Sequence, residues 1–130
     1  MRTEKRKIGD LGEALARRFL VKNGFSVLQR NFLRPCGEID IVAAKEGTIY
    51  FVEVKTVTYR TFSANKGWGS HNPEENVGSL KLGRMRRVVA VYLREKRVKK
   101  DFKFMVISVS VENLPNGNIR PRYSVLYDVL

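Results

Sequence analysis

Three charged side chains interrupt otherwise apolar segments of the sequence. Asp40 lies within a run of isoleucine and valine, and Glu53 and Lys55 alternate with valines further along the chain. A charged group that is buried without a partner is costly, so charges at such positions indicate either ion pairing or a binding site. Two carboxylates beside a lysine are the groups that metal-assisted hydrolysis of a phosphodiester bond requires.

Such a trio would bind and use a divalent cation. Asp and Glu oxygens are the ligands that Mg²⁺ prefers. The ion polarises a phosphate and lowers the pKa of a bound water, which then attacks in line, while a nearby ammonium positions that water or neutralises developing charge. The spacing supports an alternative equally well, in which Glu53 and Lys55 form a half-buried ion pair and Asp40 is exposed at a strand end.

Hydrophobic periodicity predicts the elements that position these residues. We expect helices over residues 8–23 and 77–96 and strands over residues 25–31, 38–43, 48–56, 102–111 and 120–128. The first three strands are expected to form an antiparallel meander. Strand alternation places Glu38 and Asp40 on one face, and likewise Glu53 and Lys55, so neighbouring strands would bring the charged residues together. The order α-β-β-β-α-β-β predicts an α/β fold in which helices pack on a mixed sheet.

Residues 57–76 show no clear periodicity and predict a long loop, which is either functional or a mobile surface loop. Trp68 in this loop would stack on an unpaired base or anchor the loop. His71 would touch a phosphate or simply be solvated. Cys36, beside a turn at residues 34–37, is expected to be a small buried residue.

The composition excludes several classes of protein. Lys and Arg number 25 against 13 Asp and Glu, a net charge of +12, which indicates a polyanionic partner. No segment approaches the roughly 18 to 20 apolar residues of a spanning helix, and no secretory signal is recognisable, so we expect a soluble cytoplasmic protein with no membrane contact. One cysteine and one histidine form neither an internal disulfide nor a common zinc site, so any metal is expected to have oxygen ligands.

The basic residues are concentrated in one stretch. Residues 81–103 contain ten Lys and Arg against two Asp and Glu, a net charge of +8 out of the total of +12. Such a cluster on a helix and the following loop is typical of a phosphate-binding face, and a solvated surface is the alternative. We expect Lys81, Arg84 and Arg87 to contact nucleic acid.

Two short motifs resemble the signature of the PD-(D/E)xK nuclease superfamily: Gly-Glu-Ile-Asp at residues 37–40 and Phe-Val-Glu-Val-Lys at residues 51–55. More closely, the chain resembles the YraN family over residues 8–109, a group of small bacterial proteins similar to archaeal Holliday-junction resolvases. The resemblance implies a restriction-endonuclease-like fold, with residues 1–130 forming a single nuclease-like domain. The supporting segments are residues 9–16, 30–32, 37–42 and 52–56, with Lys81 and Arg84.

The resemblance implies a role for each matching residue. Asp40 and Glu53 correspond to ligands of Mg²⁺ (or Mn²⁺), with the main-chain carbonyl of Val54 as a third ligand. Lys55 corresponds to the catalytic lysine. Glu13 corresponds to the acidic residue that the first helix often supplies to support the metal or the lysine.

Some positions stay open or depart from the family pattern. Glu13 also fits an i, i+4 surface pair with Arg17, worth roughly a few tenths of a kcal/mol, and the role of Glu38 is open. The family usually has arginine where this chain has Val57, and aspartate in a late strand where this chain has Met105. Both departures are expected to remove polar groups near the site and to change substrate contacts there.

Three functions are compatible with these features. The first is a Mg²⁺-dependent endodeoxyribonuclease acting on branched or junction DNA in repair or recombination, with a homodimer implied by resolvase-like relatives. The second is a non-catalytic nucleic-acid-binding module that keeps the nuclease fold. The third is an assembly protein whose basic face binds an acidic protein. The carboxylates favour the first, because carboxylates repel a phosphate unless a cation lies between them.

Overall fold

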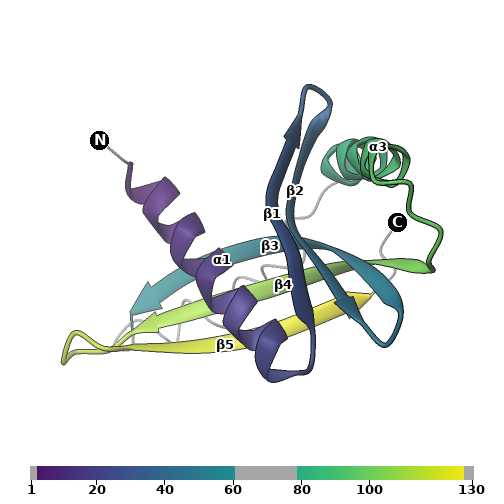
Figure 1. The fold of residues 1–130 in the computed structure, drawn as a ribbon. Coiled ribbons are helices and arrows are strands. Elements are labelled where there is room, and N and C mark those ends of the chain that lie inside the picture. The colour runs from purple at the N-terminus through teal and green to yellow at the C-terminus, as the bar shows by residue number, and fades with distance from the viewer. Residues whose placement is uncertain (1–2, 61–78, 128–130) are drawn as a thin grey trace.

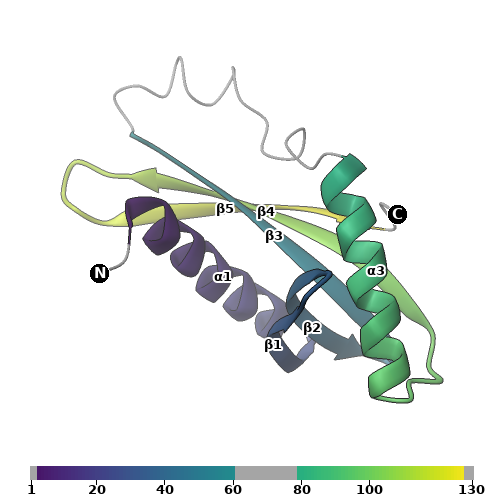
Figure 2. The same ribbon diagram turned by 90° about the horizontal axis from the view of Figure 1, so that it is seen from above.

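A five-stranded mixed sheet with two helices packed on it forms the protein (Figures 1 and 2). The computed structural model describes residues 3–60 and 79–127, and the side chains of Arg60 and of residues 79–82 lie outside that description. The elements are α1 (Glu4–Lys22), β1 (Ser26–Arg34), β2 (Gly37–Lys45), β3 (Thr48–Arg60), α3 (Ser79–Glu95), β4 (Phe102–Asn113) and β5 (Ile119–Tyr127). The predicted order α-β-β-β-α-β-β is confirmed.

The sheet has the strand order β1-β2-β3-β4-β5. The first three strands form the predicted antiparallel meander, β3 and β4 are parallel, and β4 and β5 are antiparallel. A parallel pair needs a crossover connection, and α3 lies in that connection. This arrangement is consistent with a restriction-endonuclease-like fold.

Two boundaries differ by four residues from the sequence-based expectation, and the other described boundaries by three residues or fewer. Helix α1 begins at Glu4 rather than at residue 8, because the side chain of Thr3 caps it by accepting a hydrogen bond from the Arg6 N–H at 3.2 Å. Strand β3 continues to Arg60, so the expectation that the loop begins at residue 57 is wrong. The register with β4, from Val57 opposite Ser110 to Arg60 opposite Asn113, extends the strand. The rest of the predicted loop, with Trp68 and His71, lies outside the described residues.

The two helices cover opposite faces of the sheet. Alternate residues of β2 and β3 enter different clusters, so Ile41 and Val52 pack with α1 while Val42 and Phe51 pack with α3. The β1–β2 hairpin stands up between the helices (Figures 1 and 2). Neither helix in the described part of the chain is long and apolar enough to cross a membrane.

Helix α1 approaches β3 closely at Gly12. A Cβ atom at this position would overlap the Thr56 hydroxyl and lie 2.7 Å from the Thr56 Cβ, whereas one at Gly9 would meet nothing within 4 Å. We expect Gly12→Ala to lower the free energy of unfolding by about 2 kcal/mol through overpacking. Gly9→Ala in the same helix is expected to raise it by about 0.5 kcal/mol through helix propensity.

Urea denaturation of the two variants measures both values. Thr56→Ala removes the two outer atoms that crowd Gly12, so Gly12→Ala is expected to be less destabilising in that background. Equal effects of the two glycine substitutions would contradict the packing described here.

Candidate metal and nucleic-acid site

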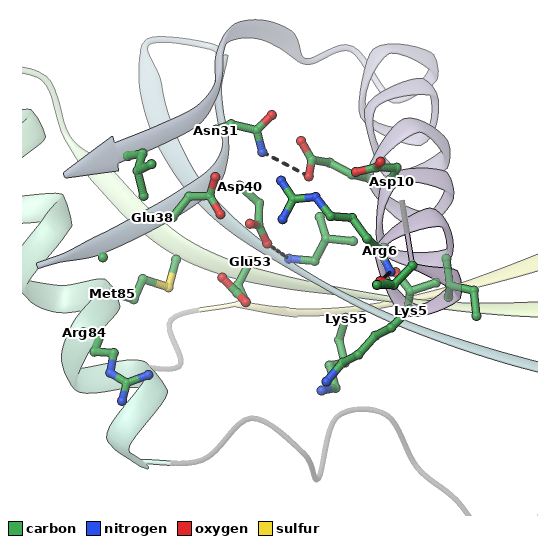
Figure 3. Close-up of a pocket in the computed structure, with 18 of the residues that line it drawn as sticks. Lys5, Arg6, Asp10, Asn31, Glu38, Asp40, Glu53, Lys55, Arg84 and Met85 are labelled. Atoms are coloured by element: carbon green, nitrogen blue, oxygen red, sulfur yellow. Dashed lines mark hydrogen bonds between the residues drawn. The ribbon is translucent and has the colours of Figure 1, made fainter. Parts of the chain in front are cut away.

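A groove of about 1530 Å³ runs between α1, the β1–β2 hairpin, β3 and the start of α3. Figure 3 shows acidic side chains between the two helices, with Arg84 on the α3 side and Lys5 and Arg6 on the α1 side. The volume exceeds the roughly 300–1,000 Å³ of typical small-molecule pockets. The charged residues that line the groove are Lys5, Arg6, Asp10, Glu13, Arg34, Glu38, Asp40, Glu53, Lys55 and Arg84.

The predicted trio comes together on adjacent strands. Strand β2 pairs with β3 with Ile41 opposite Val52, so the neighbouring Asp40 and Glu53 lie at the end of the ladder. There the Val54 N–H donates a hydrogen bond to Asp40 Oδ2 at 2.8 Å. Lys55 lines the same groove, as the shared face of β3 predicted.

Neither carboxylate of the trio is fully exposed to solvent. Asp40 is half-buried by surface area, and Glu53 is only 6% exposed. The alternative in which Asp40 is exposed at the end of a strand is therefore wrong. The backbone donor from Val54 shows that Asp40 is held in position.

The electrostatics of the groove favour uptake of a cation. Burial raises the pKa of Asp40 to about 8, helped by the nearby charges of Glu53, Glu13 and Glu38 and opposed by the Val54 hydrogen bond. Burial also raises the pKa of Glu13. Both shifts have the same main cause: burial disfavours the charged form of a carboxyl group and so raises its pKa. A cation placed among them would favour the ionised forms.

The donor set fits Mg²⁺. Within residues 3–60 and 79–127, no three Asp, Glu, His or Cys side chains form a complete metal cage. Mg²⁺ does not need one, because it keeps several waters and binds through one or two carboxylates together with substrate phosphates. Asp40 and Glu53 would supply the two carboxylates, and the Val54 carbonyl stays a predicted third ligand.

Glu13 reaches the groove from α1. Its Oε2 accepts a hydrogen bond from Asn31 Nδ2 at 3.2 Å, and it lines the groove beside Asp40. Asn31 has a φ of 51°, a left-handed conformation that asparagine tolerates. The charge of Arg17 also lowers the pKa of Glu13, as the alternative of a pair with Arg17 expected, but the hydrogen bond of Glu13 is with Asn31. Glu38, whose role was open, is exposed and lines the groove as well.

Of the three basic residues predicted to bind nucleic acid, the structure describes the side chains of two. Arg84 is exposed and lines the groove at the start of α3. Arg87 is exposed one turn further along α3 but is not a groove residue. Lys81 belongs to α3, and its side chain lies outside the described residues.

Sequence reasoning missed the basic residues of α1. Lys5 and Arg6 line the groove, and they were overlooked because apolar periodicity begins only near residue 8. The signal that would have found them is Thr3, a favoured N-cap residue. Recognising this cap places Lys5 and Arg6 in the first turn of a helix that packs beside the acids.

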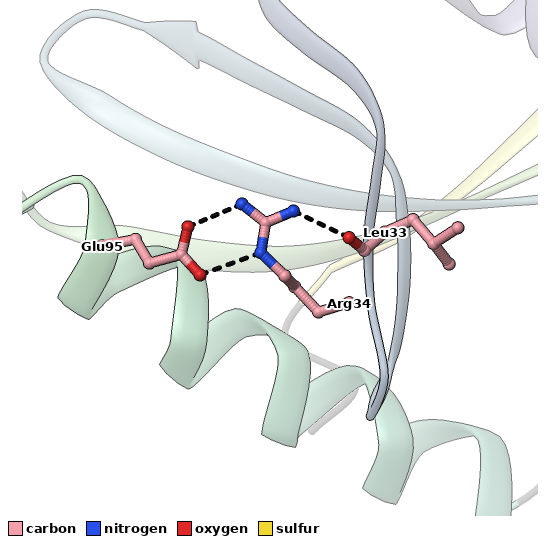
Figure 4. Close-up of polar contacts among 3 residues, drawn as sticks. All are labelled: Leu33, Arg34 and Glu95. Atoms are coloured by element: carbon pink, nitrogen blue, oxygen red, sulfur yellow. Dashed lines mark hydrogen bonds and ion pairs between the residues drawn. The ribbon is translucent and has the colours of Figure 1, made fainter.

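A double hydrogen bond fixes the hairpin to α3 (Figure 4). Arg34 donates from Nε and Nη2 to the two carboxylate oxygens of Glu95, at 2.8 and 2.6 Å, and from Nη1 to the Leu33 carbonyl at 2.7 Å. The Arg34 guanidinium also lies 4.0 Å from the centre of the Phe32 ring. The hydrogen bonds from Arg34 lower the pKa of Glu95. This fork fixes the orientation of the hairpin tip relative to α3.

The two departures from the family pattern fall in different places. Val57 lines the groove, so its position near the site is as expected. Met105 is 1% exposed and packs in the α1-side core, so the expectation that it changes polar contacts near the site is wrong. Cys36 is half-buried and packs against the α3-side core.

Comparison with known proteins finds similarity to the same protein family each time. The family described as "Uncharacterised protein family UPF0102" matches residues 12–109. A UPF0102 protein of Moorella thermoacetica is 37% identical over 110 residues, 84% of this chain and 85% of that protein. One of Corynebacterium efficiens is 33% identical over 98% of both chains, and one of Clostridium perfringens is 39% identical over 85% of this chain and 84% of the relative.

Proposed function

The chain belongs to the uncharacterised protein family UPF0102, as its resemblance to the YraN family predicted, and we propose that it is a metal-dependent endonuclease that hydrolyses DNA phosphodiester bonds. One observation carries the proposal: Asp40, Glu53 and Lys55 line one groove, with basic residues of α1 and of α3 on its two sides. A small-molecule site would not need a groove of this volume, and a metal-free binding site for a polyanion would not place carboxylates at its floor.

Each residue has a defined task in this proposal. Asp40 and Glu53 hold the divalent ion, and the Val54 N–H keeps the Asp40 carboxylate in a fixed orientation. When bound, Mg²⁺ or Mn²⁺ supplies polarisation of the phosphate and a water of lowered pKa. Lys55 positions that water or stabilises negative charge developing on the phosphate. Glu13, which accepts a hydrogen bond from Asn31, adds negative charge from α1 beside the two carboxylates that hold the ion.

The proposed substrate is branched or junction DNA, and the proposed assembly is a homodimer. Both follow from the similarity of the YraN family to Holliday-junction resolvases. One active site cuts one strand at a time, so cutting two strands of a junction together needs two copies of the chain.

A cleavage assay tests the proposal directly. The purified protein is incubated with single-stranded, duplex, forked and four-way DNA over a range of Mg²⁺ and Mn²⁺ concentrations, with EDTA as control. We expect metal-dependent cleavage that is strongest on forked or four-way DNA. If the protein cuts none of these substrates with either ion, the nuclease proposal fails.

The second candidate is a non-catalytic nucleic-acid-binding module, which the density of basic residues in segment 81–103 favours. It predicts tight binding whose affinity falls steeply with salt and is unaffected by EDTA or by Asp40→Ala. The absence of any binding to nucleic acid at low salt would instead favour an acidic protein partner.

A further inference from the structure

Two basic side chains face the acidic floor of the groove from the side opposite α3. Lys5 and Arg6 belong to the first turn of α1, and both are exposed groove residues. Figure 3 shows them across Asp40 and Glu53 from Arg84. The groove therefore has a basic residue of α3 on one wall and two basic residues of α1 on the other, where Asp10 and Glu13 of α1 also line it.

Helix stability does not explain Lys5 and Arg6. The dipole of a helix makes its N-terminus positive, so cations in the first turn are unfavourable there. Within the described residues neither Lys5 nor Arg6 forms an ion pair, whereas Lys7 in the same turn lies 3.9 Å from Glu4. Two unpaired cations at an unfavourable position indicate that they serve a ligand.

The chemistry of that ligand follows from the layout of charges. The acids on the floor would repel an anion that lay directly on them, except where a cation screens them. A single anionic group would need only one basic wall. Basic groups on both walls fit a chain of phosphates that crosses the floor, with one phosphate at the acids and further ones on either side.

We infer that Lys5 and Arg6 form a second phosphate-binding wall that holds the nucleic-acid strand on the side of the scissile phosphate opposite Arg84. This inference rests on the proposed function, because it takes the polymer to be the substrate of the groove. The guanidinium of Arg6 can bind a phosphate through two parallel hydrogen bonds, and Lys5 contributes a point charge.

The test is the salt dependence of DNA binding at one fixed Ca²⁺ concentration, which supplies a cation to screen the acidic floor and needs no cleavage. Affinities of fluorescein-labelled four-way and single-stranded DNA are measured by anisotropy at several KCl concentrations. Each phosphate contact contributes about 0.7 to 0.9 to the slope of log K against log salt. Lys5→Gln and Arg6→Gln are each expected to reduce the magnitude of the slope by nearly that amount, and the double variant by about twice as much.

Lys7→Gln is the matched control. It removes one exposed positive charge from the same helical turn, and Lys7 is not a groove residue. We expect its slope to equal that of the unaltered protein. Equal changes in all three single variants would overturn the inference, because they would reflect net charge, and so would unchanged slopes in Lys5→Gln and Arg6→Gln.

The outcomes separate the inference from the proposed function. A slope that depends on Lys5 and Arg6 in a protein that cuts no DNA supports the wall and refutes the nuclease. Cleavage that proceeds while both slopes are unchanged supports the nuclease and refutes the wall. A protein that binds no DNA at low salt refutes both. If the enzyme is active, the KM of the double variant is expected to rise more than its kcat falls. This pattern follows when a contact made equally in the ground state and the transition state is lost.

Discussion

Replacement of Asp40 by asparagine is expected to reduce Mg²⁺-dependent DNA cleavage by at least about a thousandfold, while DNA binding persists. The variant keeps the size of the side chain and an oxygen that can accept the Val54 hydrogen bond. It loses one of the two carboxylate charges that would hold the ion in the proposed site. Metal polarisation of a phosphate is worth several kcal/mol, and about 4 kcal/mol corresponds to a thousandfold in rate.

Asp101→Asn provides the control for this experiment. Asp101 is exposed, lies just before β4 and is not a groove residue, so the same chemical change there is expected to leave the cleavage rate within about twofold. Rates are measured in single turnover on the best substrate of the DNA panel. An Asp40→Asn protein with more than a tenth of the original rate would exclude Asp40 as an essential metal ligand.

Much of the fold is predictable because its signals are local. Strand β2 and the start of β3 follow from alternation of apolar residues and from the turn at Glu46 and Gly47, both of which have positive φ. The end of β3 at Arg60 is not predictable in this way, because it depends on pairing with β4, a partner distant in the sequence. The start of α1 was missed for another reason: its first turn is polar on all sides, so it contributes no apolar stripe.

The site was predictable where charge conflicts with an apolar pattern, and unpredictable where it depends on packing. Asp40 and Glu53 stand out because they interrupt buried strands. The contribution of Asn31 to fixing Glu13 depends on how α1 lies against the hairpin. The approach of Gly12 to β3 sets that position, and no local pattern in the sequence gives it.

In the absence of metal, the stability of the protein is expected to fall as pH rises from about 4 to about 9. The pKa of Asp40 is about 8 in the folded protein and about 3.9 for an unperturbed aspartate. Between these values the folded protein binds a proton that the unfolded chain does not. The free energy of unfolding therefore decreases as pH rises through this window, in total by roughly 5 to 6 kcal/mol.

Asp40→Asn is expected to remove most of this pH dependence, because the amide resembles the protonated acid and carries no charge at any pH. At pH 9 in EDTA the variant should be more stable than the unaltered protein, as measured by urea denaturation, while Asp101→Asn should not be. Mg²⁺ should stabilise the unaltered protein more at pH 8.5 than at pH 6, because it competes with the proton for the Asp40 carboxylate. If Asp40→Asn lowers stability at pH 9 and leaves the pH slope unchanged, Asp40 does not carry the raised pKa, and the affinity of the acidic floor for a cation must have another origin.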